Sequence, residues 1–113
     1  MSNRILNVEL LPKRATPAVA ELWIIVTADQ VTPTTEVRGK LVGPRHPGIS
    51  TVEIAYPLRE TERSGSTVTV CATVPEPNLW TQEAPFVYAG VVELWQDGVR
   101  CDHCPFTTSF KSH

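Results

Sequence analysis

No stretch of this chain is apolar over anything close to the roughly 20 residues that a membrane-spanning helix needs. No window of helical length repeats an apolar residue every 3.6 positions either, so we expect little or no helix. The 10 basic and 12 acidic residues are scattered, which gives a formal net charge of −2. Nucleic-acid binding needs clustered positive charge to displace counterions. We therefore expect neither a membrane nor a nucleic acid as partner.

Cysteine is also scarce. The chain has three cysteines, Cys71, Cys101 and Cys104, and an odd number is a poor basis for a disulfide framework. No basic segment followed by an apolar core of about 7 to 15 residues begins the sequence, so no signal peptide is visible. These two absences favour a reducing compartment such as the cytoplasm, and the localisation itself stays open.

The overall composition is that of an ordinary globular protein. Of the 113 residues, 42% are hydrophobic and 19% are charged. A chain of this size buries roughly two thirds of the surface that its unfolded form exposes. We expect one domain over residues 1–113.

Apolar residues at every second position, interrupted by Pro and Gly, predict an all-β domain. The alternation is clearest over residues 20–28 and 68–74. Further strands are expected over residues 6–10, 37–41, 51–56 and 86–95 and after residue 98, with loops at residues 43–48 and 59–65. In the first strand, Leu6, Val8 and Leu10 form the expected inner face. The predicted fold is an immunoglobulin-like β-sandwich of about seven antiparallel strands.

Two local features support this prediction. Asp97 and Gly98 separate the last two strands, and Gly accepts the positive φ that a tight hairpin turn requires. Tyr88 lies near the start of a strand and follows a Pro-rich loop. We expect it to be a corner tyrosine, whose hydroxyl is bonded to nearby backbone.

The last third of the chain carries a recognisable motif. Its residues are Leu79, Trp80, Pro85, Phe86, Tyr88, Gly98 and Asp102. In this order and spacing they resemble the signature of the immunoglobulin-like β-sandwich domain of family 2 glycoside hydrolases, the β-galactosidase and β-glucuronidase group. The chain departs from the family pattern at Gln82, where Pro is usual, and at Thr108, Ser109 and Lys111, where the family has Phe, Gly and Arg.

The resemblance implies a spacer without catalytic residues, because the catalytic carboxylates of that family lie in a separate barrel. The spacer would be either part of a larger enzyme or a free-standing relative. The acidic residues of this chain also favour a non-catalytic role, because a retaining glycosidase needs two carboxyl groups about 5 to 5.5 Å apart. Glu9, Glu21, Glu53 and Glu93 instead alternate with apolar residues and are expected to face solvent. We predict a non-catalytic accessory or interaction module without a cofactor, whose partner is a neighbouring domain, another protein or a second copy.

The tryptophans support a second hypothesis, a carbohydrate-binding module, because an aromatic ring can stack on a sugar. The candidates are Trp23, Trp80 and Trp95. Alternation places Trp23 and Trp95 on the outward faces of strands that belong to opposite sheets. Trp80 is expected to close one end of the sandwich. A platform shared by the three rings is therefore not expected.

The segment from Cys101 to Cys104 supports a third hypothesis, a small metal or redox site. Its candidate ligands are Cys101, His103 and Cys104. A structural zinc site takes four ligands. The fourth would have to be Cys71, His46 or His113. On an extended strand, residues three apart are separated by about 10 Å, beyond the roughly 7 Å limit for a disulfide, so we favour free thiols.

Overall fold

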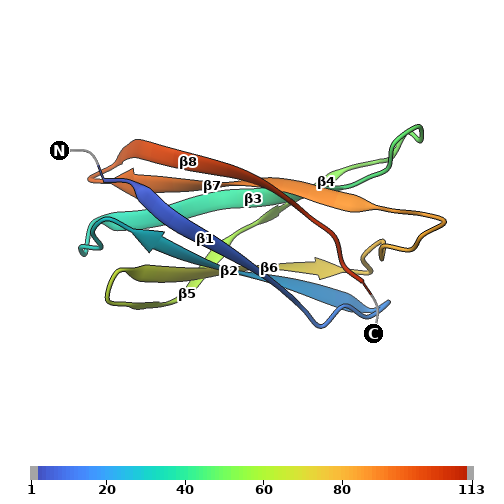
Figure 1. The fold of residues 1–113 in the computed structure, drawn as a ribbon, viewed down its shortest axis with the longest axis horizontal. Coiled ribbons are helices and arrows are strands. Elements are labelled where there is room, and N and C mark those ends of the chain that lie inside the picture. The colour runs from blue at the N-terminus through green and yellow to red at the C-terminus, as the bar shows by residue number, and fades with distance from the viewer. Residues whose placement is uncertain (1–2, 112–113) are drawn as a thin grey trace.

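A computed structural model describes residues 3–111, which form eight strands and no helix (Figure 1). The strands are β1 (Ile5–Lys13), β2 (Val19–Ala28), β3 (Thr35–Arg45), β4 (Ile54–Pro57), β5 (Arg59–Ser64), β6 (Thr67–Pro75), β7 (Val87–Gln96) and β8 (Val99–Thr108). Over these residues the fold offers no helix with the length and hydrophobicity to cross a membrane.

The strands form two antiparallel sheets of four strands each, in the orders β1-β2-β6-β5 and β4-β3-β7-β8. The first sheet and the neighbours β3, β7 and β8 have the strand order of an immunoglobulin constant-type sandwich. β4 adds a fourth strand to the second sheet. The predicted all-β, immunoglobulin-like architecture is confirmed.

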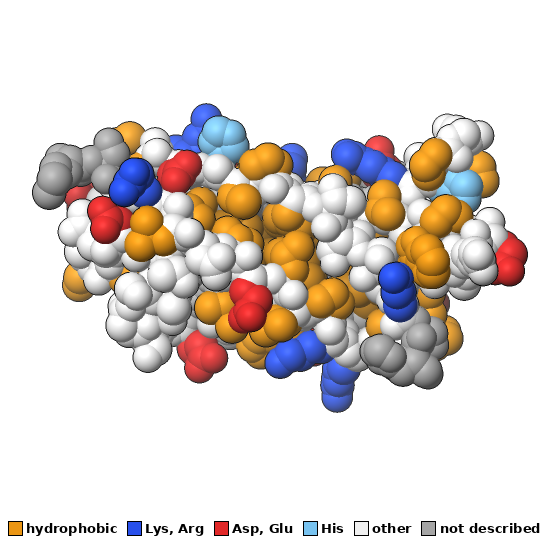
Figure 2. Space-filling model, viewed as in Figure 1, with side chains coloured by type: hydrophobic (Ala, Val, Ile, Leu, Met, Phe, Trp, Pro, Cys, Tyr) orange, Lys and Arg blue, Asp and Glu red, His pale blue; other side chains and the backbone are white. Residues whose placement is uncertain are grey.

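Period-2 alternation explains the core between the sheets. In β2 and β6 every second residue is fully buried: Ala20, Leu22, Ile24, Val26, Ala28, Val68, Val70, Ala72 and Val74. They form one cluster with Leu41 of β3 and with Val92 and Leu94 of β7. Burying one Val, Leu or Ile side chain stabilises a fold by about 1.5 to 3 kcal/mol. Apolar side chains also reach the surface across the middle of the view in Figure 2.

The prediction of a loop over residues 59–65 is wrong. Residues Arg59–Ser64 form the strand β5, which pairs with β6 at the edge of the first sheet. All six of its residues are exposed, so no apolar alternation marks the strand. Backbone hydrogen bonds to β6 hold β5 in place without help from buried side chains. The sandwich therefore has eight strands instead of about seven.

The expected inner face of the first strand needs one correction. Leu6 is 55% exposed, whereas Ile5, Val8 and Leu10 pack against the core. A register shift between Ile5 and Asn7 in the β1–β2 ladder is the cause. Such a bulge adds one residue to a strand and turns the following side chains to the other face.

The boundaries of the next two strands also differ from the prediction. β3 continues through Gly43 and Pro44, which were expected in a loop. Its pairing with β7 shifts register between Val42 and Arg45, and proline is tolerated at such a bulge because its missing N–H is not needed there. β4 is confined to Ile54–Pro57, and Val52 lies before it with 87% of its surface exposed.

A hydrogen-bond network closes the end of the sandwich near the N-terminus. The buried Asn3 amide donates to Gln96 Oε1 at 3.2 Å, and Thr35 Oγ1 donates to the same oxygen at 2.6 Å. The β7–β8 turn follows at Asp97 and Gly98, whose φ angles are 53° and 78°. Two consecutive positive φ values are those of a primed hairpin turn, as predicted.

Candidate functional site

The motif residues of the last third of the chain stabilise the fold, and Tyr88 is the central one. The Tyr88 ring is 1% exposed and lies edge-on to Phe110, with ring centroids 5.1 Å apart. Its hydroxyl accepts a hydrogen bond from the Asn78 backbone N–H at 3.0 Å. Burial raises the pKa of Tyr88. Tyr88 is thus the predicted corner tyrosine, and the sequence argument did not identify Phe110 as its core partner.

Other motif residues close the sandwich. Leu79 packs against the core, and Trp80 forms an isolated bridge with Lys111. In β8, Asp102 Oδ2 accepts a hydrogen bond from the Ile5 backbone N–H at 2.8 Å, which joins the edges of the two sheets. Pro85 and Phe86 are half-buried in the loop before β7, and Gly98 forms the last turn. These residues have structural roles.

The structure does not bring the three tryptophans together. Trp23 lies on β2 in the first sheet, Trp95 lies on β7 in the second, and Trp80 lies in the loop between β6 and β7. Each ring has a cation over it: Lys13 Nζ 5.1 Å from the centroid of Trp23, Arg38 Cζ 4.1 Å from Trp95, and Lys111 Nζ 4.5 Å from Trp80. A cation in this position is attracted by the ring face that a sugar would use. Sugar binding stays a prediction for single rings, without a shared platform.

The candidate metal ligands lie on β8. Cys101 is at a bulge, His103 pairs with the outward-facing Glu93, and Cys104 pairs with the buried Val92. His103 and Cys104 therefore point to opposite faces of the sheet. Within residues 3–111, no three His, Cys, Asp or Glu side chains gather where they could hold a metal ion, and all three thiols are free. His113, one candidate fourth ligand, lies outside the described residues.

The outer face of the sheet β4-β3-β7-β8 is divided into two halves by the order of its cross-strand neighbours. Two rows hold Ala55, Val42, Ala89 and Thr107, and Pro57, Lys40, Val91 and Pro105. The next two rows hold Arg38, Glu93 and His103, and Glu36, Trp95 and Arg100. We call the first two rows the apolar half and the last two the charged half.

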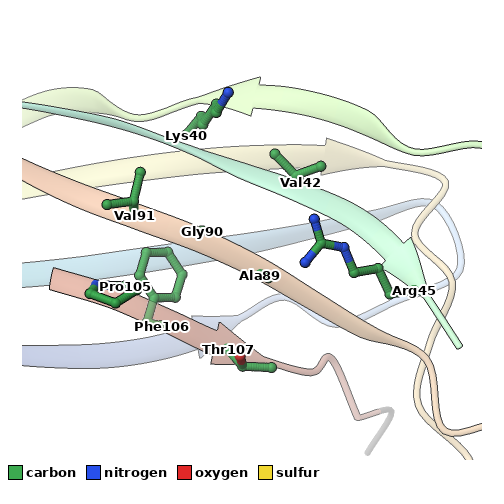
Figure 3. Close-up of a pocket in the computed structure, with 9 residues that line it drawn as sticks. All are labelled: Lys40, Val42, Arg45, Ala89, Gly90, Val91, Pro105, Phe106 and Thr107. Atoms are coloured by element: carbon green, nitrogen blue, oxygen red, sulfur yellow. The ribbon is translucent and has the colours of Figure 1, made fainter. Parts of the chain in front are cut away.

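The apolar half contains an open hollow of about 590 Å³. Figure 3 shows Lys40, Val42 and Arg45 on one side of Gly90, with Pro105 and Phe106 on the other. A Cβ at Gly90 would lie 2.4 Å from the Lys40 carbonyl oxygen and 2.6 Å from Phe106 Cζ. Glycine at this position therefore lets the phenyl ring lie against the backbone of β7.

Neither the family models nor the curated proteins include a match to this chain. Solved structures do match its fold. A family 2 glycosyl hydrolase from Bacteroides cellulosilyticus superposes with a TM-score of 0.69 at 19% identity, covering 96% of this chain and 14% of that protein. For the β-glucuronidase of Bifidobacterium dentium the TM-score is 0.65 at 18% identity, covering 96% and 18%. For a β-glucuronidase of Bacteroides uniformis it is 0.59 at 16%, covering 96% and 14%.

The chain has the fold of a sandwich domain of family 2 glycoside hydrolases. The match covers 96% of this chain, whereas the chain spans 12 to 18% of the length of the enzymes compared. The resemblance in the last third of the sequence therefore extends, as a fold, to the first two thirds.

Two carboxylates on the strands of this sandwich are held by arginine. Arg63 Nη2 donates to Glu60 at 2.6 Å, and Arg100 Nη1 donates to Glu93 at 3.1 Å. These hydrogen bonds lower the pKa of both carboxyl groups. The general acid of a glycoside hydrolase needs the opposite, a raised pKa. Glu60 and Glu93 are therefore held in the ionised form and are not suited to proton donation at neutral pH.

Proposed function

We propose that this chain is a non-catalytic accessory module that presents one face of a rigid sandwich to a neighbouring domain or protein partner. The observation that carries the proposal is the apolar half on the outer face of the sheet β4-β3-β7-β8. An antiparallel sheet that faces water usually presents polar side chains there. Short apolar side chains on that face, in neighbouring rows, are typical of a surface that another layer covers.

The carboxylates and the fold support the same proposal. Glu60 and Glu93 are bound to arginine with lowered pKa values, which suits solvated ion pairs better than acid catalysis. Structures with this fold are several times longer than the chain, so the sandwich is one part of each of them. A supporting part acts through the surfaces that it offers to its neighbours.

Two measurements test the proposal. Purified protein should leave a panel of chromogenic glycosides unhydrolysed, and turnover that disappears when one of its own Glu residues is changed to Gln would contradict a non-catalytic role. Quantitative affinity capture from the source cells should recover a protein with the wild type that is lost with Val91→Lys. The matched control is Thr73→Lys, which places the same charge on the exposed outer face of the other sheet. Equal capture by all three baits would refute docking through the apolar half.

A further inference from the structure

The charges that line the hollow have one sign. Lys40 and Arg45 are its charged lining residues, and both are positive on a chain with a formal net charge of −2. Lys40 is exposed and has no ion-pair partner within residues 3–111. Arg45 is paired with Glu53, so the unpaired Lys40 gives the hollow a local positive charge on an acidic protein.

Arg45 adds hydrogen-bond donors that the described residues do not use. Its Nε donates to Glu53 Oε1, and between residues 3 and 111 its terminal nitrogens make no hydrogen bond. Arg38 and Arg63 differ, because their terminal nitrogens donate to Glu36 and Glu60. In Figure 3 the guanidinium of Arg45 is directed from β3 toward the strand that carries Ala89 and Gly90. The N–H groups of both terminal nitrogens thus remain for a ligand beside the hollow.

The floor between these cations is apolar. Ala89 and Val91 of β7 lie beside Val42 of β3, and Pro105 borders them on β8. Phe106 also lines the hollow, and it packs against the core. The volume of about 590 Å³ lies in the range of pockets that bury a ligand. An apolar group of a ligand can be buried on this floor while an anionic group of the same ligand pairs with the cations at the rim.

We propose that the hollow binds a segment of a partner polypeptide that combines apolar side chains with Asp or Glu. The apolar side chains pack on Ala89, Val91 and Pro105. A carboxylate lies between Lys40 and the terminal nitrogens of Arg45, where the planar guanidinium can donate two parallel hydrogen bonds to it. This proposal rests on the proposed docking function and adds the chemistry of the partner.

The test uses the whole chain and three synthetic peptides of equal length. One alternates Leu and Val with Glu, the second has Lys in place of Glu, and the third has Ser. Titrated into ¹⁵N-labelled protein, the Glu peptide should shift the amide signals of Ala89, Val91 and Thr107, and its binding should weaken as NaCl is raised. Lys40→Glu should weaken that binding by about tenfold, whereas Arg59→Glu on the exposed edge strand β5 should leave it unchanged.

A second variant covers the apolar part of the proposal. Ala89→Trp fills the hollow and should abolish the shifts, while Lys40→Glu changes an exposed side chain and leaves packing intact. Three results would each overturn the inference: no shift at these amides with the Glu peptide, equal binding of the Lys or Ser peptide, or the same shifts with free glutarate. None of these results changes the outcome expected from the hydrolysis and capture tests. A failure of the peptide-binding inference is therefore distinguishable from a failure of the docking function.

Discussion

The hydroxyl of Tyr88 offers a direct test of how the loop before β7 is held. Tyr88→Phe removes one oxygen atom and retains the ring, which is buried against Phe110. The Asn78 N–H then loses its acceptor, which lies 3.0 Å away in the native protein. The side-chain packing is unchanged, so the difference in unfolding free energy reports this hydrogen bond.

The expected loss is about 1 kcal/mol. A hydrogen bond contributes roughly 0.5 to 1.5 kcal/mol net, and leaving a buried donor unsatisfied costs about 1 to 3 kcal/mol. Asn78 is an exposed residue, so water can reach its N–H and the lower values apply. In a domain of this size, that loss lowers the melting temperature by about 3 to 6 °C.

Urea unfolding followed by circular dichroism measures the difference, with an unchanged m value as the sign that only stability has moved. Tyr56→Phe is the matched control, because the other tyrosine is half-buried and the hydroxyl of Tyr56 makes no hydrogen bond within residues 3–111. It should change stability by less than about 0.5 kcal/mol. A Tyr88→Phe protein as stable as the wild type, or a larger loss in the control, would refute the corner assignment.

The phenol of Tyr88 should also make the stability of the protein depend on pH. Burial raises the pKa of Tyr88 in the folded protein, so the unfolded chain ionises first. Stability that depends on this phenol is fully present below about pH 10 and is lost as the pH rises through the higher folded pKa. Tyr88→Phe should remove that part of the alkaline loss, which urea titrations at several pH values measure.

Three further predictions concern other sites. Gly90→Ala should lower stability by about 1 to 3 kcal/mol in urea unfolding, because its Cβ would lie 2.6 Å from Phe106 Cζ; an unchanged midpoint would contradict the close approach. Burial raises the pKa of the Cys71 thiol, so mass spectrometry at pH 7.5 should show slower alkylation there than in an unfolded control. The hydrogen bond from Arg63 lowers the pKa of Glu60, so this stabilisation is present above about pH 4.3 and is lost at lower pH. The stability difference between wild type and Glu60→Gln should shrink below that pH, and a constant difference from pH 7 to 3 would exclude this linkage.

Strands with one buried face could be predicted from the sequence. Burial alternates over the whole of β2 and over most of β6, and Asp97 with Gly98 specifies the turn between β7 and β8. β5 could not be predicted, because an exposed edge strand carries no apolar signal. Leu6 was assigned to the wrong face, because a bulge leaves no mark in the residue types around it.

The candidate site was harder to predict than the fold. The motif around Tyr88 was visible because its residues lie close together in sequence. The hollow combines Val42, Ala89 and Pro105 from three strands, and they become neighbours only through the register of the ladders. Ala89 and Gly90 also carry no reactive group, so their residue types do not indicate a binding site. Pairing between distant strands is the information that the sequence pattern did not contain.

The exposed strand β5 has a consequence for the aggregation behaviour of the protein. Its backbone faces water along one side, which is the usual starting point for chain-to-chain polymerisation. Arginine and glutamate occupy four of its six positions. Pairing of another strand with β5 would desolvate these charged side chains, which is costly. That edge therefore resists fibre growth by strand addition.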